Sequence, residues 1–194
     1  MFKLPFSVLM CVLMLGALSA PLSAQASTNT QPVAINFAGQ SFIHRWSKDN
    51  LNEFTPEDQP DLTQWQQMIS VNVHPNVKDG DQLAALANAV LSNYQRSGEI
   101  IRADSKPRTN EKPAEHLIVA ILGAPGVIET AFARIMLIDD LGVILVYSRR
   151  AYGEEAANTI GAWLQANGST TENVLMDWTG FPRPAALQTL PQSD

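Results

Sequence analysis

The sequence has 194 residues, with 13 basic and 19 acidic side chains and a formal net charge of −6. Nucleic-acid binding requires a basic face that releases counterions, and the longest basic cluster is the pair Arg149-Arg150. The composition therefore argues against a nucleic-acid partner. The length suits one globular domain with a sizeable core.

Residues 1–26 have the three parts of a secretory signal peptide. Lys3 is followed by an apolar run over about residues 5–20, and a small-residue motif ends at Ala26. The run is shorter than the roughly 20 residues that a bilayer-spanning helix needs. We therefore expect cleavage near Ala26, no stable membrane anchor after cleavage, and a protein that resides in the periplasm or is secreted.

Cleavage would also remove the single cysteine, Cys11, and leave a cysteine-free mature chain. Such a chain has no thiolate nucleophile, no disulfide and no sulfur ligand for zinc. An exported protein without disulfides depends on its hydrophobic core alone, which is typical of a bacterial periplasm rather than of small extracellular scaffolds.

The mature chain divides into three parts. Residues 27–32 are polar and predict a flexible tether. Residues 33–180 predict a single domain. Residues 181–194 contain three prolines and no periodicity, so we expect a flexible tail there.

Residues 79–98 predict an amphipathic helix. An aspartate at its start can accept hydrogen bonds from free amide groups, and Gly98 can end it in the left-handed conformation. The apolar residues recur at spacings of three and four and form one stripe, made of Leu83, Leu86, Ala87, Val90, Leu91 and Tyr94.

Residues 154–168 predict a second helix. Two glutamates at its start suit the helix dipole, and the pair Asn167-Gly168 predicts its end. Ile160, Trp163 and Leu164 would form its buried stripe.

The other periodic segments predict strands, over residues 33–38, 40–46, 52–54, 68–74, 99–103, 116–122, 128–138 and 143–152. The last three are separated by short turns, at residues 124–126 and 139–142. Such short connections require antiparallel neighbours. We therefore predict an α+β fold: a single twisted, mostly antiparallel sheet with two main amphipathic helices packed on it.

The order of these elements, together with the pattern W-x(6)-E-F-T-P from Trp46 to Pro56 and the following Trp65, resembles the Mog1/PsbP-like α/β/α sandwich superfamily. The resemblance covers about residues 33–166. It implies mostly non-catalytic roles: extrinsic subunits, partner-binding modules, chaperones for secreted effectors and small periplasmic lipoproteins. It supplies no shared catalytic residues, and this chain lacks the lipid-attachment cysteine of some bacterial members.

The usual catalytic motifs are absent: there is no G-x-S-x-G elbow, no phosphate-binding G-x-x-x-x-G-K-[ST] loop, no H-E-x-x-H and no EF-hand spacing. His44, His74 and His116 fall on three separate predicted strands, which favours single polar positions over a metal site. The acidic stretch over residues 52–65 predicts a solvated loop, with Trp65 folded onto the core. We expect no catalytic residue, no metal and no cofactor, although the sequence leaves enzymatic activity open.

The segment YSRRAYG, residues 147–153, is the strongest candidate for binding. Side chains alternate on a strand, so Arg149 and Arg150 point to opposite faces, Arg149 with Tyr147 and Arg150 with Tyr152. Two interpretations remain open. In one, an arginine pairs internally with a carboxylate such as Glu99, Asp104 or Glu115. In the other, both aromatic residues and Arg134 frame a site for an anion or an acidic partner.

These observations predict an exported, non-catalytic binding or accessory protein of the bacterial periplasm that acts through protein–protein interaction. One version is an immunity protein against a periplasmic toxin. This hypothesis requires an exposed aromatic patch, for which the candidates are His44, Trp46, Phe54, Tyr147 and Tyr152. The alternative is a small-ligand carrier or a hydrolase with a carboxylate/arginine pocket, which requires a cavity of roughly several hundred cubic ångströms.

Overall fold

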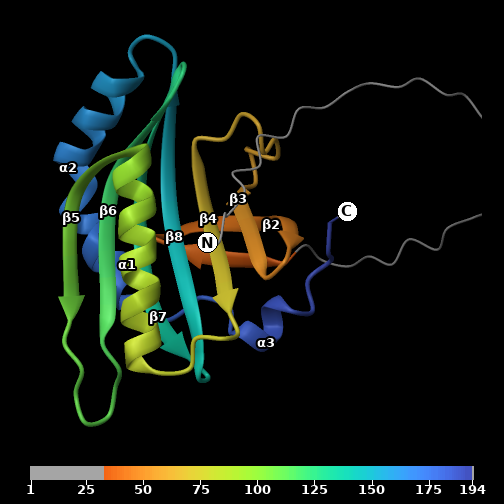
Figure 1. The fold of residues 1–194 in the computed structure, drawn as a ribbon. Helices are drawn as coiled ribbons and strands as arrows, with labels where there is room; N and C mark the ends of the chain where they lie inside the picture. Colours follow the sequence, from red (N-terminus) through yellow and green to blue (C-terminus); the bar gives the residue numbers. More distant parts are fainter. Residues whose placement is uncertain (1–32, 194) are drawn as a thin grey trace, which may run out of the picture. The chain divides into compact units, whose positions relative to one another are not determined.

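The computed structural model describes residues 33–193, and the expected signal peptide and tether, residues 1–32, lie outside them. Within the described part, eight strands form one sheet and three helices accompany it (Figure 1). The strands are β1 (Ala34–Phe37), β2 (Gln40–Lys48), β3 (Leu51–Pro56), β4 (Gln67–His74), β5 (Gly98–Lys106), β6 (Glu115–Ala124), β7 (Val127–Ile138) and β8 (Leu141–Tyr152).

The sheet is antiparallel throughout, with the strand order β1-β2-β3-β4-β8-β7-β6-β5. It consists of two meanders joined where β4 pairs with β8. Two-residue turns link β6 to β7 and β7 to β8, as the turn-rich gaps predicted, whereas longer loops link β3 to β4 and β5 to β6. The predicted α+β class, with a single antiparallel sheet, is confirmed.

Helix α1 (Gly80–Ser97) connects β4 to the distant edge strand β5. Its N-cap is Asp79, whose carboxylate accepts a 2.8 Å hydrogen bond from the amide of Gln82. Its buried residues, among them Leu83 and Ala87, pack against Ile118 and Ile135 on one face of the sheet. The predicted stripe is therefore the one that the helix buries.

Gly98 does not end α1 in the left-handed conformation, because its φ of 177° is extended. A Cβ atom at this position would lie 1.9 Å from the carbonyl oxygen of Ile121 on the neighbouring strand. The glycine is thus required by the close approach of two backbones where α1 turns into β5.

Helix α2 (Ala156–Asp177) covers the opposite face of the sheet, where it packs against Phe132 among others. It continues through Gly168, at which the sequence predicted its end. Beyond the glycine, Leu175 and Met176 return to the buried side of the helix. Their burial offsets the roughly 1 kcal/mol that an internal glycine costs. No helix within residues 33–193 combines the length and the apolarity needed to cross a membrane.

The predicted flexible tail is instead packed against the domain. The short helix α3 (Pro184–Leu187) begins with a proline, which suits the first helical position. Leu187 and Leu190 are buried in the same core as α2. The amide of Ser193 donates a 2.7 Å hydrogen bond to the carbonyl oxygen of Ser47. The spacing of Leu187 and Leu190 thus indicates packing of the tail better than the surrounding prolines indicate flexibility.

Candidate functional site

Arg150 lies on the α1 side of the sheet in a completed ion pair. Its Nε donates to Glu129 Oε2 at 2.7 Å, and Glu129 is its direct partner across β7 and β8. The guanidinium carbon lies 3.9 Å from the ring centroid of Trp65. Tyr152 donates from its hydroxyl to the carbonyl oxygen of Trp65 at 2.7 Å and holds the loop in place. Arg150 is therefore a structural residue, with Glu129 as the carboxylate in place of the three candidates predicted.

Arg149 lies on the α2 side and is partly exposed. Its guanidinium carbon is 5.1 Å from the ring centroid of Trp163. Tyr147, beside it, donates to Gln67 Oε1 at 2.9 Å. Burial raises the pKa of Tyr147, and the charge of Arg149 acts in the opposite direction. No carboxylate among residues 33–193 lies within ion-pair distance of Arg149.

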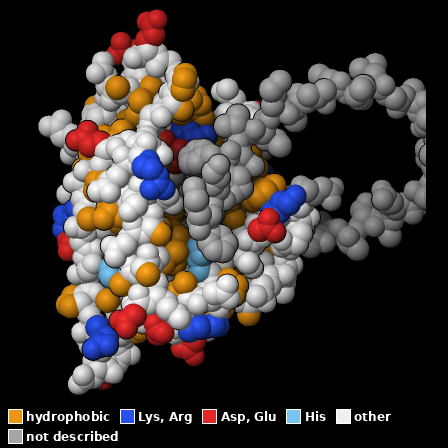
Figure 2. Space-filling view, in the orientation of Figure 1, with side chains coloured by type: hydrophobic (Ala, Val, Ile, Leu, Met, Phe, Trp, Pro, Cys, Tyr) orange, Lys and Arg blue, Asp and Glu red, His pale blue; other side chains and the backbone are white. Residues whose placement is uncertain are grey.

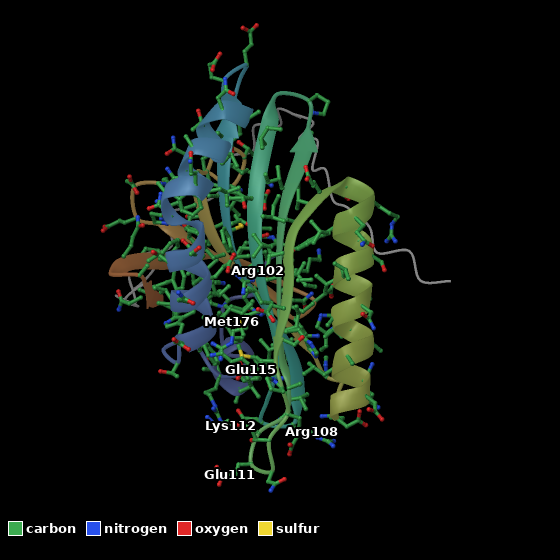
Figure 3. All side chains as sticks on the ribbon, turned by 90° about the vertical axis from the view of Figure 1, so that its left-hand side faces the viewer. Arg102, Arg108, Glu111, Lys112, Glu115 and Met176 are labelled. Atoms are coloured by element: carbon green, nitrogen blue, oxygen red, sulfur yellow. The ribbon has the colours of Figure 1, made fainter. Side chains whose placement is uncertain are left out.

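Arg134 does not join these residues. It forms an ion pair with Glu115 at 2.7 Å, and its Nη1 donates to the carbonyl oxygens of Leu175 and Trp178. Met176 and Glu115 mark this junction between β6 and the end of α2 in Figure 3. The predicted site framed by Tyr147, Tyr152 and Arg134 is wrong, because the three side chains serve three different contacts.

His44 belongs to a partly buried chain of hydrogen-bonded polar side chains. Ser47 donates to Asn52 Oδ1 at 2.7 Å, and a hydroxyl has only one proton to donate. The 2.7 Å contact between His44 Nε2 and Ser47 Oγ is therefore donated by the histidine. A base that activates serine must accept its proton, and Ser47 is only 1% exposed. His44, Ser47 and Asn52 are residue types found in catalytic triads, but here the histidine donates to the serine, whereas a catalytic histidine accepts the serine proton.

The other two histidines, His74 and His116, lie apart from this chain of side chains. His116 Nδ1 contacts Ser105 Oγ at 2.8 Å, while its Nε2 and that of His74 are buried and have no hydrogen-bond partner among residues 33–193. Burial lowers the pKa of both histidines. In a catalytic triad a third group orients the histidine ring, and within the described part of the chain no such group contacts His116 Nε2. No group of three or more His, Cys, Asp or Glu side chains among the described residues could hold a metal ion.

The acidic loop before β4 is organised by its own hydrogen bonds. Asp61 accepts from both the amide and the hydroxyl of Thr63, and Gln59 Oε1 accepts from the amides of Gln66 and Gln67. Trp65 is 3% exposed, which confirms its predicted burial. The loop positions Trp65 beneath Arg150.

Two of the five residues of the predicted aromatic patch, Phe54 and Tyr147, belong to the core. Phe54 is 0% and Tyr147 is 5% exposed, so neither can form a surface patch. Trp46 differs: it is partly exposed and belongs to neither of the two core clusters. A register shift after His44 turns Trp46 toward the α1 side of the sheet, opposite Glu53.

Helix α1 contacts β5, β6 and β7, and leaves the strands beyond β8 to its side (Figure 1). We call the α1-side surface of β2, β3 and β4 the open face. Strand alternation and register place several partly exposed residues on it, among them Trp46, Leu51, Glu53, Ser70 and Asn72. Hydrophobic side chains reach the surface beside α1 on this side of the molecule (Figure 2).

Glu53 gives the open face an unusual electrostatic feature. Burial raises the pKa of its carboxyl group, the charge of Arg150 opposes this rise, and the charge of Glu129 adds to it. Arg150 already neutralises Glu129. Glu53 is therefore a second carboxylate near Arg150, whose charge is already paired with that of Glu129.

Two small cavities lie within residues 33–193. One of about 130 Å³ lies between the β3–β4 region and α3. Another of about 170 Å³ lies between α1 and the β5–β6 pair, next to His116. Pockets for drug-sized ligands occupy roughly 300–1,000 Å³.

No protein family model matches the chain, and no curated protein matches it. Among solved structures, the Saccharomyces cerevisiae Ran-binding protein Mog1p is 12% identical, with a TM-score of 0.47 over 76% of this chain and 92% of that one. A mutant of Mog1 is 11% identical, with a TM-score of 0.45 over 76% and 93%. Both solved structures are of Mog1, the protein whose name the Mog1/PsbP-like resemblance carries.

Sequence reasoning found both arginines but missed the residues that distinguish them. Glu129 and Thr130 are adjacent in the sequence, and only the β7–β8 register shows that one faces Arg150 and the other Arg149. The sequence pattern places Trp163 in the buried stripe of α2 and gives no indication that Gln67 lies beside Arg149. The hairpin between two predicted strands could have supplied the register.

Proposed function

We propose that this protein is exported, resides in the periplasm or is secreted, and acts as a non-catalytic binding module whose open face contacts a protein partner. The observation that carries the proposal is Trp46, a large aromatic residue outside both core clusters. Leu51, on the same face and partly exposed, also belongs to neither cluster.

Tryptophan is enriched among the residues that contribute most to protein–protein binding energy. On the open face it is accompanied by hydrogen-bonding groups of Ser70 and Asn72, which suits an apolar centre with a polar rim. The small volume of the two cavities supports this proposal over the alternative of a small-ligand carrier or hydrolase. A toxin directed at the periplasm is one partner of the required kind.

Affinity capture from periplasmic extract tests the proposal. Tagged mature protein should recover a partner that Trp46→Ala weakens at least tenfold, which corresponds to about 1.4 kcal/mol. Ile101→Ala is the matched control, because Ile101 is an exposed apolar residue on the distant strand β5. Recovery of the bait alone, or equal effects of the two substitutions, would contradict the proposal.

Export requires a separate experiment. Residues 1–30 should direct a reporter that is active only outside the cytoplasm, because they contain the complete signal-peptide pattern. A silent reporter would overturn the proposed location without bearing on the open face.

A further inference from the structure

We infer that Arg149, with Trp163, Tyr147 and Gln67 around it, is a binding subsite for a carboxylate group. The subsite lies on the α2 side of the sheet, opposite to the open face. It therefore goes beyond the proposed function and does not depend on it.

The neighbouring Arg150 has a similar environment and can be compared with Arg149. Both guanidinium groups lie over an indole, at 3.9 Å from the ring centroid of Trp65 and at 5.1 Å from that of Trp163. Across β7 and β8, Glu129 stands opposite Arg150 and supplies a carboxylate at 2.7 Å. Both arginines therefore contact a tryptophan ring, but only Arg150 has a carboxylate as its cross-strand partner.

Neutral residues face Arg149 on both sides. The cross-strand partners of Arg149 are Thr130 on β7 and Gln67 on β4. The Thr130 hydroxyl donates to the carbonyl oxygen of Ala120, and Gln67 Oε1 accepts from Tyr147. These groups place hydrogen-bonding atoms around the guanidinium but leave its positive charge without a counter-charge among residues 33–193.

A guanidinium group presents up to five N–H donors in a planar fork that matches a carboxylate. The cation–π contact with the ring of Trp163 restrains the guanidinium group, so less conformational freedom is lost on binding. The amide group of Gln67 adds a donor next to it, because its oxygen is occupied by Tyr147. Arg149 is thus a preorganised cation at a partly exposed position.

The chemistry favours a singly charged carboxylate over a phosphate. One arginine supplies one positive charge, and the neighbouring groups are neutral. The chain as a whole has a formal charge of −6, which opposes a multiply charged anion. The carboxylate can belong to an aspartate or glutamate side chain or to the C-terminus of a peptide.

NMR of the arginine Nε–H groups tests the subsite, with acetate as the shared probe. The Arg149 signal should shift saturably, with a dissociation constant on the order of 10 mM, while Arg150 should not shift because Glu129 occupies it. Arg108, exposed in the β5–β6 loop, reports the nonspecific effect (Figure 3). N-acetylglycine and N-acetylglutamic acid α-amide then distinguish a C-terminal carboxylate from a side-chain carboxylate.

Two variants make the test specific. Arg149→Gln should abolish the acetate-dependent shift of the Trp163 indole N–H. Gln67→Glu keeps the arginine but places a carboxylate opposite it, so it should move the Arg149 signal without acetate and weaken acetate binding at least tenfold. A linear shift equal to that of Arg108, or unchanged binding in Gln67→Glu, would overturn the inference. Circular dichroism confirms that both variants are folded.

Discussion

Arg134 on β7 and Leu175 near the end of α2 are joined by a 2.9 Å hydrogen bond, donated by Arg134 Nη1 to the backbone carbonyl. The same nitrogen donates to the carbonyl oxygen of Trp178 at 2.7 Å. The last carbonyl groups of a helix have no partner within the helix. A sheet arginine therefore supplies the donors that end α2, and ties the helix to the sheet beneath it.

Arg134→Met should destabilise the protein by about 2–4 kcal/mol, because it leaves Glu115 without its partner and removes a donor from the carbonyl groups of Leu175 and Trp178, of which only Leu175 keeps another, the Trp178 amide. Lys106→Met is the matched control. Lys106 also reaches the end of α2, through the carbonyl of Met176 and the carboxylate of Asp177, but its ion pair is exposed and should be worth less than about 1 kcal/mol. Urea denaturation measures both, and equal losses would refute the role assigned to Arg134.

Gly98→Ala should cost about 3 kcal/mol or more, because its Cβ would lie 1.9 Å from the Ile121 carbonyl oxygen and the two strands must separate. Gly161→Ala should instead stabilise by about 0.5–1 kcal/mol, since Gly161 lies within α2 and a Cβ there meets nothing within 4 Å. Thermal unfolding of both variants tests this contrast. A tolerated Gly98→Ala would show that the strands do not approach so closely.

The histidines should make the protein sensitive to mild acid. Burial lowers the pKa of His74 and His116 below the ordinary value of 6.5. The unfolded chain therefore binds their protons first, and stability should fall as the pH drops below about 6.5. The physical cost is that protonation places a buried Nε2–H where the described residues offer no acceptor. The double variant His74→Gln/His116→Gln should flatten the dependence in urea denaturation between pH 7.5 and 5. An unchanged slope would contradict this explanation.

The elements of the fold were predictable because their signals are local. The stripe from Leu83 to Tyr94 needs no knowledge of its partner strands, and two-residue turns specify antiparallel neighbours directly. The end of α2 was not predictable from Gly168 alone. Whether a helix continues past a glycine depends on burial of Leu175 and Met176, which the tertiary structure determines.

Of the candidate site, the sequence predicts which face of the sheet each side chain lies on, because side chains alternate along a strand, but not which residues it contacts. Alternation correctly separates Arg149 from Arg150, but strand register decides that Glu129 meets the second of them. Arg134 lies on a different strand, β7, so alternation along β8 says nothing about it. Its contact with Leu175 at the end of α2 joins residues 41 positions apart. Long-range pairing of this kind leaves no periodic signal in the sequence.

Glu53 should give a pH dependence of the opposite sign to that of the histidines. Burial raises the pKa of its carboxyl group, so the folded state holds the proton more tightly than the unfolded chain does. Stability from this group is then fully present below its unfolded pKa of about 4.3, and is lost as the pH rises through the folded value. Glu53→Gln, which resembles the protonated form, should raise the thermal midpoint at pH 7 and leave it nearly unchanged at pH 4. Asp58→Gln, in the exposed loop, is the control and should have little effect at either pH. If Glu53→Gln lowered the midpoint at pH 7, attraction to Arg150 would outweigh burial, and the carboxylate would be a stabilising part of the open face.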